Sequence, residues 1–156
     1  MGETVKIGRC LIQTDLHYLV DDHCWVRFND DGTLTVGITD VAQHMAGPVL
    51  HVYVRKKGLR QKGQNLATIE SGKWVGPLKA PVSGEIVKAN EALEKDPGLV
   101  NRSPYGEGWV VRLKALKLEQ EREALLTGAA AVEAYRRKIE QQSLKACAEV
   151  AACESG

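Results

Sequence analysis

Short apolar runs rich in β-branched residues alternate with Gly, Pro, Asn and Asp along the chain up to about residue 115. This pattern predicts a mostly β fold, because β-branched side chains favour strands and the intervening residues favour turns. The clearest strand is expected at residues 49–54, and N-D-D-G at residues 29–32 predicts a hairpin turn. Further strands are expected at residues 10–12, 25–28, 33–38, 65–71, 74–75, 85–90 and 108–115.

Helical signals are short in this part of the chain. Thr39 or Asp40 can cap a helix at residues 41–45, which the Gly-Pro pair at residues 47–48 would end. We expect one further helical turn at residues 91–95. The segments between the strands are expected to be loops, including a basic loop at residues 55–63 and a structured loop at residues 96–101.

The pattern changes near Lys117, where Ala, Glu, Leu, Lys and Arg become frequent. These residues are strong helix formers, so the C-terminal part is predicted to be helical. One helix is expected to carry Leu118, Arg122, Leu125 and Leu126, and Gly128 is expected to break it. A second helix is expected at residues 129–152, with contact positions at Val132, Tyr135, Ile139 and Leu144.

The length of 156 residues suits one domain with an appendage. We expect a β-rich domain at residues 1–115 and a helical segment at residues 116–156 that packs on it or extends from it. The 21 basic and 20 acidic residues nearly balance, so charge favours neither a nucleic acid nor an anionic membrane as partner. No apolar run is long enough to span a bilayer.

The four cysteines, Cys10, Cys24, Cys147 and Cys153, form no C-x-x-C pair. We therefore expect free thiols in a reducing cytoplasm, although an organellar location stays open. Cys147 and Cys153 lie six residues apart and would not share a face of one helix, so a disulfide between them is not expected.

One lysine lies in a short turn that could carry chemistry. The run E-S-G-K-W at residues 70–74 follows an apolar segment, and a second turn signal, A-P-V-S-G, follows at residues 80–84. A tight turn would expose the side chain of Lys73, and the small residues Ser71 and Gly72 would leave room for a modifying enzyme. The competing interpretation is an ordinary surface lysine, and the local residues alone favour it. Lys79, nearby, is expected to be such a lysine.

Five ordered motifs change that balance. H-C-W-V at residues 23–26 looks like an H-x-W-[VA] pattern, and residues 36–43 match V-G-I-T-x-x-A-Q. E-S-G-K at residues 70–73 lies where E-S-V-K is usual, and A-P-V-S-G-E at residues 80–85 keeps the expected spacing. Later landmarks at residues 90–109 also match. On these motifs the chain, over about residues 20–115, resembles the glycine-cleavage H protein and its lipoyl-carrying relatives.

The resemblance implies an α+β, mostly β fold: a lipoyl/biotinyl-domain-like β-sandwich or hybrid barrel with the lysine on a hairpin turn, short helices and a C-terminal helical extension. It implies that lipoate is attached covalently to Lys73. Glu70, Ser71, Gly72 and Trp74 would surround this cofactor site, with Glu70 and Ser71 as ligase-recognition residues or as ordinary polar groups at a strand end. The protein would be a non-catalytic monomer whose swinging arm serves several enzymes.

Departures from the family pattern suggest which cargo the arm carries. Gly72 stands where Val is usual, Trp74 replaces a small residue, and the segment at residues 55–62 holds five basic residues. These features, with a long tail that carries two cysteines, resemble H-like lipoate-binding proteins found with heterodisulfide-reductase-like complexes in sulfur-oxidising bacteria. The favoured hypothesis is therefore a sulfur carrier. The alternative is a glycine cleavage system H protein that carries an aminomethyl group.

The resemblance also implies partners. A lipoate ligase or lipoyl transferase would load the arm, and dihydrolipoamide dehydrogenase would reoxidise it. The remaining partners would be either a heterodisulfide-reductase-like complex or glycine decarboxylase and aminomethyltransferase. The basic segment is either a solvated loop or a docking patch for an acidic partner.

Other candidate sites carry weaker signals. His23 and Cys24, with His44 and His51, show no zinc-ligand spacing, so no metal site is predicted. Catalysis by Cys24 or the tail thiols would need a nucleophile–base motif, which we do not find. Trp74 could shape arm or partner contacts, or it could simply pack.

Overall fold

The computed structural model describes residues 3–141 and 147. Its largest sheet has seven antiparallel strands in the order β12-β3-β4-β5-β11-β10-β7. Their bounds are β3 His17–Leu19, β4 Cys24–Phe28, β5 Leu34–Ile38, β7 Gly58–Arg60, β10 Gly84–Ala89, β11 Val111–Ala115 and β12 Leu126–Thr127.

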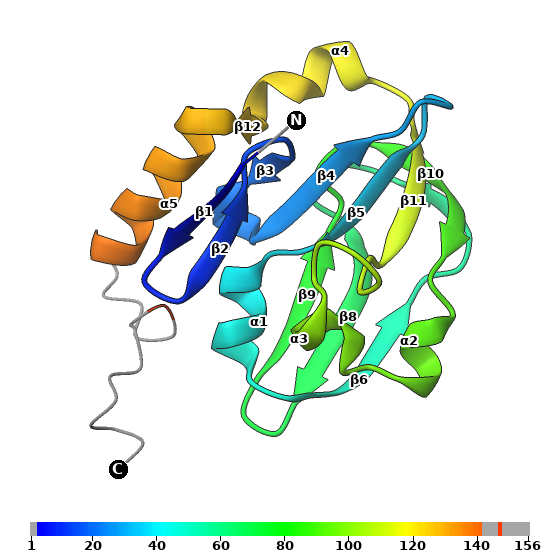
Figure 1. Cartoon of the computed structure of the whole chain (residues 1–156). Coiled ribbons are helices and arrows are strands. Elements are labelled where there is room, and N and C mark those ends of the chain that lie inside the picture. The colour runs from blue at the N-terminus through cyan, green and yellow to red at the C-terminus, as the bar shows by residue number, and fades with distance from the viewer. Residues whose placement is uncertain (1–2, 142–146, 148–156) are drawn as a thin grey trace.

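A second, three-stranded sheet has the order β6-β8-β9 and lies across the first (Figure 1). It consists of β6 Val49–Val54, β8 Asn65–Ser71 and β9 Val75–Lys79, all antiparallel. The N-terminus adds a two-stranded hairpin of β1 Thr4–Ile7 and β2 Cys10–Gln13. The helical elements are η1 Val20–Asp22, α1 Asp40–Ala46, α2 Ala92–Lys95, α3 Leu99–Arg102, α4 Leu118–Glu121, η2 Arg122–Ala124 and α5 Gly128–Gln141.

The core divides into two apolar clusters. The first lies between the two large sheets and includes Val26, Val36, Leu66, Ile69 and Leu78, all with no exposed surface. The second lies under β1, β2 and α5 and is rich in aromatic residues. The predicted mostly β sandwich is thus confirmed, because strands from both sheets bury one face against a shared core.

Two of the sequence motifs meet inside this core. Trp25 of β4 pairs with Gly37 of β5, and a Cβ on Gly37 would lie 2.7 Å from the indole ring. A glycine is therefore required at this place in the V-G-I-T run. The indole Nε1 of Trp25 donates a hydrogen bond of 2.9 Å to the carbonyl oxygen of Pro104. The H-x-W and V-G-I-T motifs are thus two halves of one packing unit.

The following helix, α1, extends one residue beyond the predicted residues 41–45 at each end, with the predicted N-cap and stop. The Thr39 hydroxyl accepts a hydrogen bond of 3.1 Å from the Ala42 backbone N–H, as an N-cap should. Gly47 ends α1 with a φ of 73°, a value that side chains rarely permit. These two residues fix the length and direction of α1 beside the hairpin that carries Lys73.

The C-terminal segment differs from its prediction. A single helix carrying Leu118, Arg122, Leu125 and Leu126 is wrong, because α4 and η2 are short and Leu126 belongs to β12, which pairs with β3. Strand pairing with the sheet edge replaces the local helical preference. The helix predicted at residues 129–152 is present as α5 as far as residue 141, and Leu144 lies outside the described residues.

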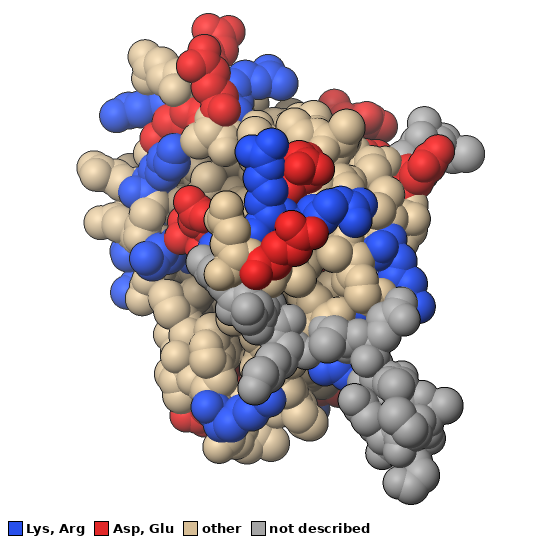
Figure 2. All heavy atoms as spheres, turned by 90° about the vertical axis from the view of Figure 1, so that its left-hand side faces the viewer, with Lys and Arg blue, Asp and Glu red and all other residues tan. Residues whose placement is uncertain are grey.

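Helix α5 packs through one aromatic side chain. Tyr135 is fully buried and lies edge-on to Tyr18, with ring centroids 5.8 Å apart. Val132 and Ile139 pack partly against the same cluster. On the outer face of α5, basic and acidic side chains are intermixed (Figure 2), and Arg137 pairs with Glu133. The division into two domains stays a prediction.

Two loops contain regular structure that the sequence analysis missed. Residues 58–60 of the predicted basic loop form β7, which pairs with β10. The predicted loop at residues 96–101 includes the start of α3. Both elements are very short, and each is stabilised by neighbours distant in sequence. None of the helices within the described residues is long and apolar enough to cross a membrane.

Candidate functional site

Lys73 lies at the tip of the hairpin between β8 and β9. The backbone N–H of Ser71 donates a hydrogen bond of 2.7 Å to the carbonyl oxygen of Trp74, which closes the turn. The Ser71 hydroxyl lies 3.4 Å from the Lys73 backbone nitrogen, which donates to it. Ser71 is buried, whereas Gly72 and Lys73 are exposed. The turn therefore anchors its first residue and presents the lysine to solvent.

The stem of Lys73 lies across the end of α1. A Cβ on Gly47 would stand 3.1 Å from Lys73 Cε, so the missing side chain makes room for the lysine. A groove begins here and is lined by Arg9, Gln43, His44, Gly47, Pro48, Val49, Lys73, Gly98, Asn101 and Arg102. The lysine thus starts in a groove shared by α1 and α3.

Trp74 folds back onto the second strand of the hairpin. A Cβ on Gly76 would lie 2.2 Å from the Trp74 ring, so the indole rests directly on the β9 backbone. Trp74 is half-buried and also lines a cavity with His23, Met45 and Lys79, among others. The side chain therefore packs on β9, and it also forms one wall of a cavity that is separate from the Gly47 groove.

The remaining predicted site residues surround Lys73 in different ways. Glu70 Oε1 lies 4.0 Å from His51 Nε2, and both side chains are exposed, so this ion pair contributes little to stability. Gly72 has open space around it, and nothing within 4 Å would meet a Cβ there. The structure therefore does not require glycine at residue 72. The roles of these residues toward a cofactor stay predictions.

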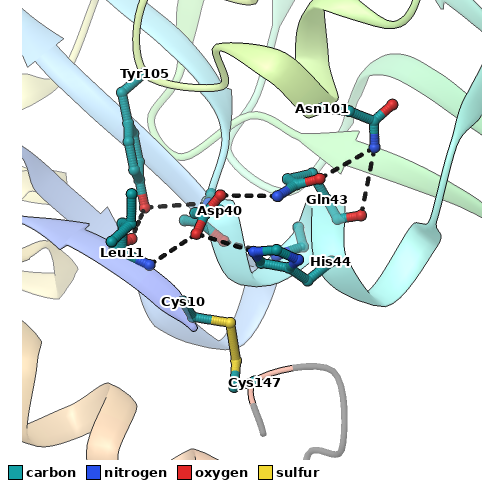
Figure 3. A network of polar contacts seen from close by, with 10 residues as sticks. Cys10, Leu11, Asp40, Gln43, His44, Asn101, Tyr105 and Cys147 are labelled. Carbon is teal, nitrogen blue, oxygen red and sulfur yellow. Dashed lines mark hydrogen bonds and ion pairs between the residues drawn. A yellow bond between two sulfur atoms is a disulfide. The ribbon is translucent and has the colours of Figure 1, made fainter. Parts of the chain in front are cut away.

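A buried polar network supports the floor of the groove (Figure 3). The Asp40 carboxylate accepts hydrogen bonds from the Leu11 backbone N–H at 2.7 Å and from Gln43 Nε2 at 2.8 Å. Asn101 Nδ2 donates to the carbonyl oxygen of Gly47 at 2.9 Å, and Asn101 Oδ1 accepts from the Val49 N–H at the same distance. This amide therefore fixes the backbone on which Lys73 lies.

Tyr105 extends this network to the N-terminal hairpin. Its hydroxyl donates to the Leu11 carbonyl oxygen and accepts from the Asp40 backbone N–H at 3.1 Å. Burial raises the pKa of Tyr105 well above its usual value, so the hydroxyl stays protonated. Tyr105 and Asn101 lie among the landmarks of the resemblance at residues 90–109, and their contacts show that both have a structural role at the site.

The expectation of free thiols is wrong for two of the cysteines. Cys10 and Cys147 form a disulfide, because tertiary packing brings together residues that are 137 positions apart. Cys24 is a free thiol, and burial raises its pKa to about 12, so it is protonated and unreactive at neutral pH. Cys153 lies outside the described residues.

The histidines are dispersed. His23 has a left-handed backbone with φ of 53°, and burial lowers its pKa to about 4, with a smaller contribution from Lys138. His44 lies on α1 and His51 on β6. Within the described residues, one group could offer three metal-ligand atoms: Cys10, Asp40 and His44, of which Cys10 is bound in the disulfide.

Some residues of the basic segment at 55–62 make contacts within the protein. Lys56 Nζ lies 2.9 Å from Glu94 Oε1 of α2, and residues 58–60 belong to a strand. The pKa of Lys56 is raised by its hydrogen bond to Glu94. A docking role for this surface stays a prediction.

The chain is similar to proteins of one family. Residues 16–142 match the family model described as Glycine cleavage H-protein. Glycine cleavage system H protein 2 of Aquifex aeolicus is 41% identical over 92% of this chain and 91% of its own length. Probable glycine cleavage system H protein 2 of Sulfolobus acidocaldarius is 41% identical over 88% of this chain and 93% of its own. The crystal structure of a glycine cleavage system H protein from Mycobacterium marinum covers 81% of this chain and 99% of its own, with a TM-score of 0.68 and 31% identity.

Proposed function

Because the chain belongs to the glycine cleavage H-protein family, we propose that Lys73 carries lipoate in amide linkage and that the protein is a non-catalytic carrier. The observation that carries this proposal is the exposed position of Lys73 at the tip of the β8–β9 hairpin, in the register of the family's lysine motif. A ligase can surround such a tip, and a buried or mid-strand lysine would be out of its reach.

The hairpin explains how a carrier without catalytic groups can serve several enzymes. The stem of Lys73 and its acyl chain form a long, flexible arm that ends in a dithiolane ring. The arm stays tethered to the protein, so its reactive end has a high effective concentration near a docked enzyme. The ring supplies the chemistry by opening to a dithiol and closing to a disulfide, and the protein supplies attachment and recognition.

We propose an aminomethyl group as the cargo, passed between glycine decarboxylase and aminomethyltransferase. The relatives described above bear the glycine cleavage name, and none of those names refers to sulfur oxidation. The sulfur-carrier hypothesis thus rests only on Gly72, Trp74, the basic segment and the tail, and we do not adopt it. The carrier would also require a lipoate ligase or transferase and dihydrolipoamide dehydrogenase.

Intact-mass measurement tests the attachment. Protein produced in lipoate-competent cells is expected to gain one lipoyl increment, and Lys73→Arg is expected to abolish it. Lys79→Arg is the matched control, because Lys79 is also exposed on the same hairpin, and it is expected to keep the increment. Lipoylation that persists in Lys73→Arg would assign the acceptor to another residue.

The cargo is tested with lipoylated protein, glycine decarboxylase and glycine. We expect the arm to become loaded with an aminomethyl group, which mass spectrometry of the Lys73 peptide would detect. A lipoylated protein that glycine decarboxylase cannot load would contradict the glycine-cleavage role and leave a lipoyl carrier of another cargo.

A further inference from the structure

The N-terminal hairpin and the C-terminal segment meet at the disulfide between Cys10 and Cys147. Their Cα atoms lie 5.2 Å apart, and the residues are 0% and 1% exposed. The Arg9 backbone N–H donates a hydrogen bond of 3.0 Å to the Cys147 carbonyl oxygen beside the bond. The function proposed above makes no use of this cysteine pair.

The disulfide lies beside an acid–base pair (Figure 3). Cys10 Sγ, a carboxylate oxygen of Asp40 and a ring nitrogen of His44 all lie within 4.8 Å of one another. His44 Nε2 is 3.3 Å from Asp40 Oδ2, and the same oxygen accepts from Leu11 N–H, which holds β2 against α1. A thiolate released at Cys10 would therefore form next to an imidazole that can supply a proton.

The same helix leads from this pair to Lys73. His44 lies in the last turn of α1, and Gly47, which supports the Lys73 stem, follows three residues later, about 4.5 Å along the axis. Arg9, His44, Gly47 and Lys73 line one groove. An acyl arm on Lys73 that lies along this groove would bring its dithiol toward His44 and the disulfide.

We propose that Cys10 and Cys147 form an intramolecular thiol–disulfide exchange site for the reduced arm on Lys73, with His44 as proton donor to Cys10. This inference rests on the lipoylation of Lys73 proposed above. It adds a redox step within the carrier to the transfer of cargo between enzymes.

The exchange balances without a further reagent. One arm thiolate attacks the Cys147 sulfur, the Cys10–Cys147 bond breaks, and the Cys10 thiolate takes a proton from His44. The second arm thiol attacks the mixed disulfide, closes the dithiolane and releases the Cys147 thiol. The arm loses two electrons and two protons, and the cysteine pair gains both. The proton that His44 gave is restored by the arm thiols.

The tether makes the site selective for the dithiol of the arm. Both half-cystines are shielded from solvent, so a free thiol must find a rare opening at its own low concentration. A tethered arm has an effective concentration of order millimolar. At a probe concentration of about 10 μM, we therefore expect exchange with the arm to be about 100-fold faster than exchange with free dihydrolipoamide.

The test uses full-length protein whose lipoylation has been verified by intact mass. Catalytic dihydrolipoamide dehydrogenase and excess NADH reduce the arm, samples are quenched in acid, and free thiols are alkylated and located by peptide mass. Alkylation of Cys10 and Cys147 is expected to follow reduction of the arm. In Lys73→Arg, with the same enzyme and 10 μM dihydrolipoamide, it is expected to be about 100-fold slower.

A second variant tests the role of His44. His44→Gln is expected to slow cysteine alkylation at least about tenfold while the arm is reduced at the normal rate. His51→Gln, at an exposed histidine on β6, is the matched control and is expected to behave like the parent protein.

The outcomes separate the two proposals. Protein that lacks the lipoyl increment contradicts the proposed function. A lipoylated protein whose arm is reduced while the disulfide stays intact overturns the exchange alone, as does equal alkylation in Lys73→Arg. An unchanged rate in His44→Gln overturns the assignment of the proton donor.

Discussion

The stem of Lys73 crosses Gly47 closely because that residue carries no Cβ. Trp74 lies on Gly76 for the same reason, and the indole of Trp25 lies on Gly37. At each place a large side chain packs against bare backbone. At His23, by contrast, a residue with a large side chain occupies a left-handed backbone conformation that favours glycine, and its ring nitrogen Nδ1 is buried. These individual residues determine how the hairpin and its surroundings respond to mutation and pH.

His23 makes stability depend on pH. Burial lowers its folded-state pKa to about 4, whereas the unfolded value is 6.5. Between these pH values the unfolded state therefore binds more protons than the folded state. The contribution of neutral, buried His23 to the free energy of unfolding is complete above pH 6.5 and is lost as pH falls toward 4. We expect this loss to be of order 1–3 kcal/mol.

The variant His23→Asn should flatten this pH profile, because asparagine does not titrate there and tolerates a left-handed backbone. Urea unfolding at several pH values between 4 and 7 measures it. His51→Asn, at an exposed histidine, should retain the parent slope. An equally steep loss in His23→Asn would assign the effect to other groups.

The β8–β9 hairpin acts as one element because its turn, Lys73 and Trp74 share contacts. Ser71 closes the turn with Trp74, and Trp74 then covers Gly76 on β9. Lys73 contacts the end of α1. The direction of the Lys73 side chain thus depends on both the hairpin and the helix, and α1 is itself fixed by Thr39 and Asn101.

Gly76→Ala tests the packing of Trp74 on this element. The new Cβ would lie 2.2 Å from the indole, so the ring must move, and we expect a destabilisation of about 1–3 kcal/mol. Gly72→Ala in the same hairpin meets open space and should change stability by less than about 0.5 kcal/mol. Urea unfolding measures both. In a Trp74→Ala background the Gly76→Ala cost should largely disappear, and a full cost there would contradict the contact.

At the scale of the whole molecule, the disulfide between Cys10 and Cys147 encloses most of the chain in one covalent loop. It joins Cys10 of β2 to Cys147, 137 residues later. Of the elements that lie between these two cysteines in the sequence, β12 pairs with β3, and α5 packs against Tyr18. Such a link limits the unfolded chain more than the folded one. The fold is thus held together by a covalent bond between its N-terminal hairpin and Cys147, and the exchange proposed above would break this bond.

Cys10→Ser should lower the free energy of unfolding by about 2–4 kcal/mol under oxidising conditions. A reductant should lower the stability of the parent protein by a similar amount and leave Cys10→Ser unaffected. Urea unfolding with and without dithiothreitol measures this. Cys24→Ser is unsuitable as a control because Cys24 is in the core, whereas Thr14→Ser on the surface serves. A parent protein insensitive to reductant would contradict a stabilising disulfide.

Local chemistry determined much of the fold in advance. Val49–Val54 and Asn65–Ser71 are strands with the predicted bounds, and Thr39 and Gly47 cap the two ends of α1, because β-branched residues, caps and glycine act over a few positions. The predictions of secondary structure were wrong where pairing with a strand distant in the sequence determines the conformation. Leu126 joins a strand because β3 offers an open edge, and the short β7 exists only by pairing with β10.

The same distinction applies to the site. The position of Lys73 on an exposed hairpin turn followed from the amino-acid sequence, because turn chemistry and motif spacing are local properties. The surroundings of Lys73 depend instead on tertiary packing: the bare backbone of Gly47, the contact of Trp74 with Gly76, and the pairing of Cys10 with Cys147 next to His44. The first and last of these contacts join residues far apart in the chain, and only packing of the sheets and helices brings such residues together.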